Sequence, residues 1–515
     1  MATGSDEPIT VQAVHDVRMV SVQCFNAAGE SVRPAWDFSM PLYELGQQLR
    51  PEGDDRPFVL ELTLWPSGRA HVTYSRDLRS LSPTRIVWEP DFRYPGHPLP
   101  GRVDEAGAGP PRPTDPRTLA EVQALLDEFA ELYRRANGTP VEFTAGYSED
   151  EIADAEARMG LRLPEDLRAV YRCMHDDVSE RRPLGWFCPL PLDQVVADYL
   201  GGAGPGSYGW HDDVFDVFPV VLEAFPPGTI KRVSRSDRWV TFGSDFAMNH
   251  CAVDLDPGPR GVAGQLIEYG RDTDGPVRYV ADSVLDLLRR TVADLRDGVA
   301  WNDDYTLRGP VTPLHRHIEP VGSRSLAAVI AELAQPSTVQ QVYLNDADSL
   351  DLDALVPLSN LREISINRAV AVRGHLPADL PVEALTLHAE QVDLDAVTGH
   401  PTLWALTVKS SGRPTSIAAL TSVPTLTFLD LGGAEIADLH RITDLASVRV
   451  LALNRAQWEE LRAHDVALGG LAAVELSGHA RLADAIEWAA WLTAQVRPEA
   501  TPPVILEYTD GGGRR

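Results

Sequence analysis

The feature that most constrains the fold of this chain is a short apolar pattern that returns seven times between residues 339 and 477. Each copy fits L-x-x-L-x-L with conservative apolar exchanges. The central apolar residues of the copies are Val342, Ile364, Leu385, Leu406, Leu429, Leu451 and Val474. Successive central residues are 22, 21, 21, 23, 22 and 23 positions apart. One copy is too short to bury its own leucines, so neighbouring copies must stack to form a core.

This period lies within the range of about 20 to 29 residues that is typical of leucine-rich repeats. We therefore predict a leucine-rich-repeat solenoid over residues 339–498, with a helix over 482–496 as its C-terminal cap. The ninth position of each copy, where such repeats often carry an Asn ladder, holds other residues here. The pattern thus favours the solenoid but not the ladder.

The strands of such a solenoid line its concave face, and the residues between the buried positions point to solvent. We predict a protein-binding surface there, because aromatic side chains concentrate interface energy. Its candidate contact residues are Tyr343, Glu363, Trp404, Phe428, Asp430 and Glu475. The alternative is a set of ordinary surface residues, since single exposed apolar side chains are common.

A second informative stretch runs from residue 143 to residue 200. The S-x-x-E spacing of Ser148 and Glu151 is typical of a capping box, which predicts a helix start. Gly160 supplies a left-handed stop for this helix, and Pro164 predicts the opening of the next one.

The same stretch resembles a known family. The run from Glu149 to Tyr171, E-x-x-I-x-x-x-E-x-x-x-G-x-x-L-P-x-D-L-R-x-x-Y, is similar to the SUKH superfamily, which includes the yeast cell-wall synthesis regulator domain and many bacterial toxin-immunity proteins. Residues 239–269 resemble that family's strand, D-L-D-P turn and G-x-x-G-Q-[VLI]-I strand. The resemblance implies an α+β domain over residues 117–300, opening with a helix for which Thr118 and Glu121 form a second capping box.

The N-terminal stretch predicts a third folded part. Apolar alternation at 17–25 and 58–65, a short helix at 41–49 and a Pro66-Ser67-Gly68 turn indicate a small α+β domain over residues 11–94. Its hairpin weakly resembles the YezG-like immunity proteins. The whole chain is therefore predicted to be a multidomain α+β protein, with a Pro/Gly-rich linker at 95–116 and a connector at 301–338.

The charge of the chain excludes some classes of partner. With 75 acidic and 46 basic residues the net charge is −29, which argues against nucleic-acid binding because phosphate contacts need clustered cations. An acidic protein attracts basic partners, although acidity also serves plain solubility. The start of the sequence lacks a signal pattern and no stretch reaches the length of a membrane helix, so we expect a cytoplasmic protein.

The motifs indicate neither catalysis nor cofactor or metal binding. Four scattered cysteines form no C-x-x-C pair, which predicts reduced thiols without zinc. Residues 204–209 match G-x-G-x-x-G, but no strand leads into them, so a nucleotide site is not expected. His315 and His317 lack further ligands nearby in sequence. Asp254 and Asp256 resemble an acid/base pair, yet the family resemblance makes them part of a structural turn.

Two functional hypotheses follow. The first is a non-enzymatic binding protein, an immunity protein that occludes a basic toxin such as a nuclease, with an alternative as a cytosolic regulatory scaffold of the cell-wall-regulator type. Further candidate contacts of this binding protein are Trp210, Asp212, Asp213 and Asp216 in an acidic loop. The alternative for this loop is a solvated turn. The second is a small enzyme in the N-terminal part, which is weakened by the isolation of His15, Cys24 and His71.

Overall fold

The structure is a computed structural model in which the chain folds into two compact units. It describes residues 7–16, 20–33, 38–54, 56–98, 112–138, 140–175, 182–185, 187–201, 220–246, 249–270, 277–298, 317–318, 325–346 and 349–508. The first unit combines residues 1–92, 317–337 and 341–515, and the second combines residues 93–316 and 338–340. The N-terminal part and the repeated segments, which the sequence separates into two domains, therefore share one unit.

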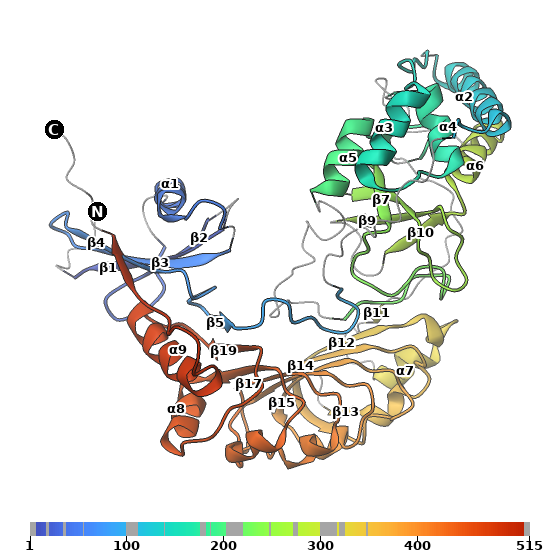
Figure 1. Cartoon of the computed structure of the whole chain (residues 1–515). Helices are drawn as coiled ribbons and strands as arrows, with labels where there is room; N and C mark the ends of the chain where they lie inside the picture. The colour runs from blue at the N-terminus through green and yellow to red at the C-terminus, as the bar shows by residue number, and fades with distance from the viewer. Residues whose placement is uncertain are drawn as a thin grey trace, which may run out of the picture. The chain divides into compact units, whose positions relative to one another are not determined.

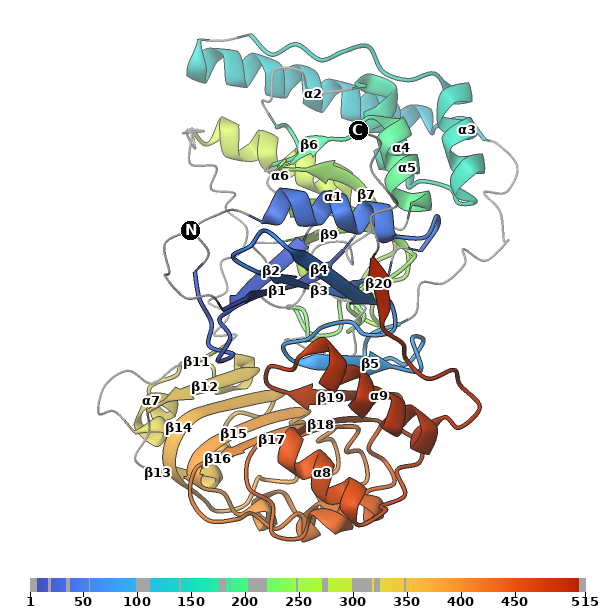
Figure 2. The ribbon, with the colours of Figure 1, turned by 90° about the vertical axis from the view of Figure 1, so that its left-hand side faces the viewer.

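The N-terminal part of the first unit is a five-stranded sheet with strand order β2-β1-β3-β4-β20. Its strands are β1 (Ile9–His15), β2 (Val20–Phe25), β3 (Phe58–Leu64), β4 (Ala70–Ser75) and β20 (Leu506–Tyr508). Helix α1 (Ser39–Leu49) packs over this sheet, and Val11 and Leu60 are fully buried beneath it (Figure 2). The predicted hairpin is confirmed: β3 and β4 pair antiparallel, and Gly68 has a φ of +84°, which glycine adopts without strain.

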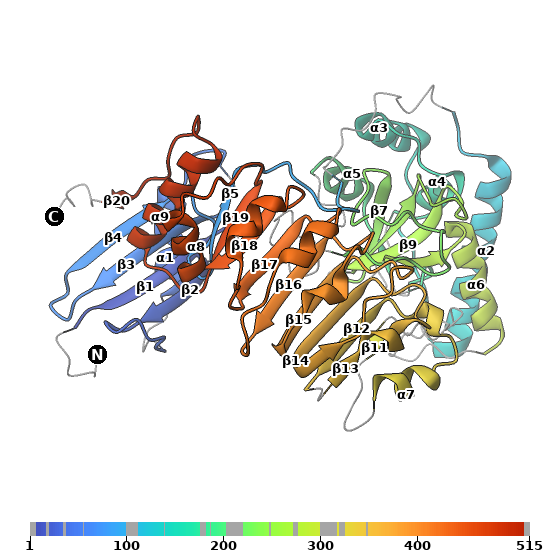
Figure 3. The same cartoon turned by 90° about the horizontal axis from the view of Figure 1, so that it is seen from below.

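The repeated segments form a largely parallel sheet in the order β11-β12-β14-β15-β16-β17-β18-β19-β5 (Figure 3). Its strands are β11 (His317–Ile318), β12 (Gln341–Asn345), β14 (Glu363–Arg373), β15 (Ala384–Gln391), β16 (Ala405–Ser410), β17 (Phe428–Gly433), β18 (Val450–Asn454), β19 (Ala473–Ser477) and β5 (Thr84–Val87), with β13 (Ser349–Asp351) beside β14. The seven central apolar residues of the sequence pattern pair with one another in consecutive register. Each is at most 1% exposed, so the repeat spacing correctly places one buried residue per strand.

Short helical segments return the chain from one strand of this sheet to the next. They are α7 (Leu326–Ala331), η2 (Pro336–Thr338), η3 (Leu352–Leu355), η4 (Leu394–Val397), η5 (Ala418–Ser422), η6 (Leu439–Asp444) and α8 (Arg455–Ala463). Leu352 and Leu355 are fully buried, which shows that the return segments supply the second wall of the core. Helix α9 (Leu482–Val496) follows the last parallel strand, with the bounds that the sequence predicts.

Segments far apart in the sequence join the two sheets of the first unit. Strand β5 pairs antiparallel with β19, and β20 pairs antiparallel with β4. Between the sheets, Glu61 is 6% exposed and accepts hydrogen bonds from Gln12 Nε2 at 2.8 Å, Arg481 Nη2 at 2.8 Å and Leu482 N at 3.1 Å. Burial alone raises the pKa of Glu61, but these three donors outweigh it and hold the pKa below its ordinary value.

The second unit is an antiparallel sheet with order β10-β9-β8-β7-β6, covered on one face by helices α2 to α6 (Figure 1). The strands are β6 (Cys188–Pro189), β7 (Trp239–Ser244), β8 (Asn249–Asp254), β9 (Gln265–Gly270) and β10 (Arg278–Ala281). The helices are α2 (Pro116–Asn137), α3 (Glu149–Met159), α4 (Glu165–Cys173), α5 (Leu192–Leu200) and α6 (Val284–Arg296). Apolar side chains from helices and strands form one core between these two layers.

The helix starts of the second unit partly follow the sequence prediction. The capping box of Ser148 and Glu151 is present, and Gly160 ends α3 with a φ of +69°. The predicted box at Thr118 is wrong: the carboxylate of Asp115 accepts from Thr118 N at 2.9 Å, which starts α2 three residues earlier. Asp is a more favourable N-cap residue than Thr, so the helix begins after Asp115 and Thr118 lies inside its first turn. None of the helices that the structure describes is both long and apolar enough to span a bilayer.

Candidate functional site

The first family motif of the second unit builds a buried ion-pair network. Arg168 on α4 is 1% exposed, and its guanidinium lies 2.5 Å from Glu156 Oε2 and 2.8 Å from Glu149 Oε2 on α3. Glu156 is 3% exposed and also accepts from Leu163 N at 2.9 Å. Tyr171 is buried and donates to the Leu190 carbonyl at 3.0 Å. These motif residues are engaged in contacts inside the domain, Arg168 with Glu149 and Glu156 and Tyr171 with Leu190, so their role is structural.

The second family motif is also structural. Asp254 is fully buried and accepts from Gln265 Nε2 at 2.9 Å and Asp256 N at 3.0 Å. Burial raises the pKa of Asp254. Asp256 is exposed and pairs with Lys231 at 2.5 Å. The two carboxylates thus have separate environments and do not form an acid/base pair.

In the first unit, the side chains between the buried positions of the parallel sheet form two rows across the strands, which together we call the sheet face. The first row consists of Gln341, Glu363, Ala384, Ala405, Phe428, Val450 and Ala473, and the second of Tyr343, Ser365, Thr386, Thr407, Asp430, Ala452 and Glu475. Neighbours in a row are about 4.8 Å apart, the spacing of adjacent strands. The second row is therefore a nearly continuous strip of hydroxyl and carboxyl groups beside a more apolar strip.

Five of the predicted contact residues lie on the sheet face. Tyr343, Glu363, Phe428, Asp430 and Glu475 are all partly buried, so none stands free in solvent as the sequence pattern predicts. Small or apolar residues between them on the same rows, Ala384 and Ala405 among others, are buried. The sheet face therefore presents the acids and aromatics from a recessed surface.

Burial raises the pKa of all three acids of the sheet face, which disfavours their charged forms. Burial raises the pKa of Glu363, although Gln341 Nε2 donates to its carboxylate at 2.8 Å. Burial also raises the pKa of Asp430, against the opposing effects of the hydrogen bond from Gly432 N at 2.9 Å and of the positive charge of Lys409.

Glu475 is the third of these acids, and burial is again the main cause of its raised pKa. Arg85 on β5 lowers that pKa through a 2.9 Å ion pair, while the charge of Asp430 raises it further. Sequence reasoning misses Arg85, because 390 residues separate it from Glu475 and no local pattern links them.

The prediction for Trp404 is wrong. Side chains alternate along a strand, and residue 404 shares its side with Leu406 and Val408 instead of Ala405 and Thr407. Trp404 is accordingly 3% exposed, and its indole Nε1 donates to Glu383 Oε2 at 3.3 Å. It is a core residue. The acidic loop with Trp210, Asp212, Asp213 and Asp216 lies outside the described residues.

Within the described parts of the chain, no cluster of three or more His, Cys, Asp or Glu side chains could hold a metal ion. No disulfide joins any of the four cysteines, and burial raises the pKa of Cys24, Cys173 and Cys251. A raised pKa keeps a thiol protonated at neutral pH and lowers its nucleophilicity.

The layered α+β fold of the second unit and its two internal motifs define a domain class. Residues 146–290 match the sequence model of the SMI1 / KNR4 family (SUKH-1), so the chain contains a domain of this class and the family resemblance is confirmed there.

Three fungal proteins are similar to a part of this chain. The cell wall biosynthesis/cell cycle regulator smi1 of Schizosaccharomyces pombe is 40% identical over 89 residues, which are 16% of this chain and 17% of the relative. The cell wall assembly regulator SMI1 of Saccharomyces cerevisiae is 36% identical over 87 residues, 16% of this chain and 17% of the relative. The glucan synthesis regulatory protein of Neurospora crassa is 36% identical over 85 residues, 16% of each chain. Each match thus spans less than a fifth of the relative's length.

Proposed function

We propose that this protein is a non-enzymatic regulatory scaffold that binds a basic segment of a partner protein on its sheet face. The observation that carries the proposal is geometric: Glu363, Asp430 and Glu475 lie on one face of one sheet, together with Tyr343 and Phe428. Aromatic side chains beside desolvated charges are the composition of binding hot spots. The regulatory part of the proposal is supported by the fungal relatives, which are regulators of cell-wall processes.

Glu363 suits this role because burial raises its pKa and the neutral amide of Gln341 donates to its carboxylate, whereas Glu475 already pairs with Arg85. An acid that is partly buried without a full set of donors is less stable ionised than it would be in water. A Lys or Arg from a partner would lower that penalty on binding, and the net charge of −29 would speed the approach of a basic partner.

We further propose that the parallel sheet belongs to a leucine-rich-repeat solenoid. Support comes from the strand spacing of 21 to 23 residues, the consecutive register and the buried return segments. We also propose that the N-terminal hairpin is related to that of YezG-like proteins. This proposal rests on β3, β4 and their turn.

The proposal is tested by affinity copurification of the tagged full chain from its own cells at low and high salt. We expect a stoichiometric partner that is retained at low salt and lost as salt screens the charges. Glu363→Arg should abolish retention. Asp395→Arg, which reverses an exposed acid in the return segment η4, is the matched control and should retain the partner.

Two results would contradict the proposal. Equal retention by the Glu363 and Asp395 variants would show that the interface lies away from the sheet face. Absence of any partner at either salt, with wild-type chain of normal stability, would remove a constitutive complex altogether.

A second candidate function is toxin immunity, which the excess of 75 acids over 46 bases favours because an acidic protein attracts a basic partner such as a nuclease. In that case the copurified partner would carry a toxic domain, and expressing that domain alone would stop growth unless this protein were present. A partner that acts in cell-wall synthesis would instead support the scaffold.

A further inference from the structure

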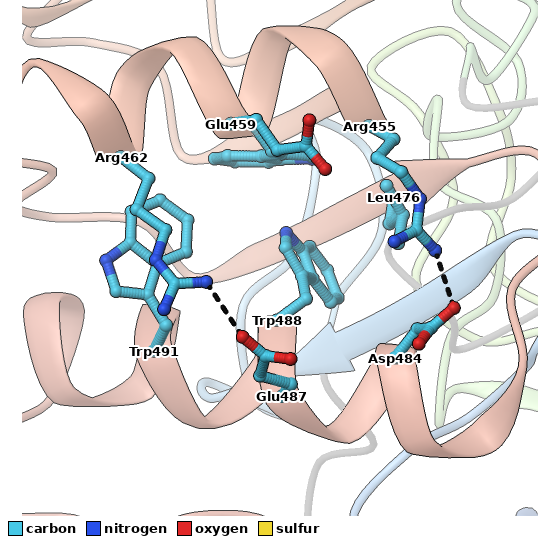
Figure 4. Close-up of a pocket in the computed structure, with 9 residues that line it drawn as sticks. Arg455, Glu459, Arg462, Leu476, Asp484, Glu487, Trp488 and Trp491 are labelled. Carbon is cyan, nitrogen blue, oxygen red and sulfur yellow. Dashed lines mark hydrogen bonds and ion pairs between the residues drawn. The ribbon is translucent and has the colours of Figure 1, made fainter.

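A second surface of the first unit, away from the two rows of the sheet face, has the features of a binding site. Helices α8 and α9 enclose a cavity of about 110 Å³ that is open to solvent. It is lined by Arg455, Trp458, Glu459, Arg462, Leu476, Asp484, Glu487, Trp488 and Trp491. We call this cavity the tryptophan cleft. Figure 4 shows Trp488 between two ion pairs, with its ring directed from α9 toward α8.

Two ion pairs and a ring contact join the walls of the tryptophan cleft. Arg455 lies 3.3 Å from Asp484, and Arg462 lies 3.1 Å from Glu487, so each ion pair ties α8 to α9. Trp458 is 1% exposed and packs edge-on against Trp488 with ring centroids 5.7 Å apart. A preformed cavity of this kind binds without a large cost of ordering its own side chains.

One polar group in the cleft is unsatisfied. Trp488 is 8% exposed, and its indole Nε1 is buried without a hydrogen-bond acceptor among the described residues. Its neighbour Trp458, by contrast, donates from Nε1 to the Glu475 carbonyl at 3.0 Å. A buried N–H without an acceptor is unfavourable, and a ligand carbonyl at this point would remove the penalty.

The rim of the cleft carries one unmatched charge. Both arginines are engaged in the ion pairs above, whereas Glu459 is exposed and forms no ion pair with a described residue. Figure 4 shows Glu459 on α8, opposite Trp488. The rim is therefore complementary to a cation held beside an apolar group.

We propose that the tryptophan cleft binds a short peptide segment of a partner protein that presents an aliphatic side chain next to a Lys or Arg. The cavity holds the volume of about three or four water molecules, which is close to the four carbon atoms of a leucine side chain. The peptide carbonyl accepts from Trp488 Nε1, the aliphatic side chain lies against Leu476 and the indole rings, and the cation pairs with Glu459. This site is separate from the sheet face, and its test does not depend on the partner proposed there.

The test is titration of the ¹⁵N-labelled full chain with N-acetyl-Leu-Lys-amide, followed through the indole N–H signals. Trp488→Phe identifies the signal of Trp488 by its disappearance. We expect that signal to shift saturably downfield, because a new hydrogen bond deshields the proton. N-acetyl-Leu-Glu-amide and N-acetyl-Gly-Lys-amide should each bind several-fold more weakly, since one lacks the cation and the other the aliphatic side chain.

A pair of charge variants separates this site from general electrostatics. Glu459→Gln should weaken binding of the Leu-Lys peptide several-fold, and Glu460→Gln, which removes the adjacent exposed acid of α8, should leave it unchanged. Both are surface changes that keep the fold. A Trp488 signal that does not move with the Leu-Lys peptide, or equal affinities for the two charge variants, would overturn the proposal.

Discussion

Glu156 in the second unit and Glu363 in the first are both shielded from water, but their surroundings differ. Glu156 lies 2.5 Å from the buried guanidinium of Arg168. Glu363 accepts a hydrogen bond from the neutral amide of Gln341, and burial raises its pKa. Acids that the chain pairs with its own cations hold the fold together, whereas an acid that lacks such a cation is suited to receive one from a partner. The following three predictions test this distinction.

The largest effect is expected for Arg168→Met. This change removes the closest cation from Glu156, which is 3% exposed, and so leaves a buried carboxylate without its closest counter-ion. We expect a loss of about 3–5 kcal/mol in the free energy of unfolding of the second unit. Hydrogen exchange of the α3 and α4 amides in the full chain measures this loss of stability.

The matched control for this prediction is Arg289→Met, which breaks an exposed ion pair with Glu121. Exposed pairs contribute little, because water already solvates both charges, so the change should be below about 1 kcal/mol. Equal losses for the two variants would mean that the motif network is not a fold determinant.

An intermediate effect is expected for Glu61→Ala in the first unit. The change leaves the donors of Gln12, Arg481 and Leu482 without their shared acceptor, which should cost about 1–3 kcal/mol. The pKa of Glu61 is lowered in the fold, so its contribution is present at neutral pH and is lost as the pH falls through that lowered value.

Thermal unfolding of the wild-type chain and the Glu61→Ala variant across the acid range measures this contribution. The difference in stability should shrink on acidification. A difference that is constant with pH would contradict the assignment of Glu61 as a charged acceptor in the fold.

The smallest effect, and one of opposite sign, is expected for Glu363→Gln and Asp430→Asn. The pKa of each acid is raised in the fold, so its protonated form is favoured there, and stability is lost as the pH rises through the raised value. Removing either charge should therefore raise the free energy of unfolding at neutral pH by about 1 kcal/mol. The gain should vanish in acid, where the wild-type side chains are already neutral. If either variant were less stable than the wild-type chain at neutral pH, the charged acid would stabilise the fold, as Glu156 does, and the prediction would be wrong.

Local features of the fold could be predicted from the sequence because neighbouring residues determine them. The capping box at Ser148 and the stop at Gly160 depend on a few adjacent residues, and both are present. The repeat period placed each central apolar residue in a buried strand position, since burial of one face repeats with the period. The family motif indicated the SUKH-type domain, which the family match confirms over residues 146–290.

Long-range pairing could not be predicted. No local pattern indicates that Thr84–Val87 adds to the last strand of the parallel sheet, or that Glu61 meets Arg481. Trp404 was misplaced because its position relative to the strand start was counted one residue out of phase. For the tryptophan cleft the sequence did hold a signal, since Trp488 and Trp491 are one helical turn apart. Only the fold shows that Trp458 meets them.

The most direct test of the account measures two properties of Glu363→Gln in the full chain: its free energy of unfolding at neutral pH and its retention of the copurified partner. We predict that the variant is more stable than the wild-type chain and binds the partner more weakly, because the same charge is costly in the fold and useful at the interface. Unchanged partner retention, or a fall in stability, would contradict the assignment of the sheet face as the binding site.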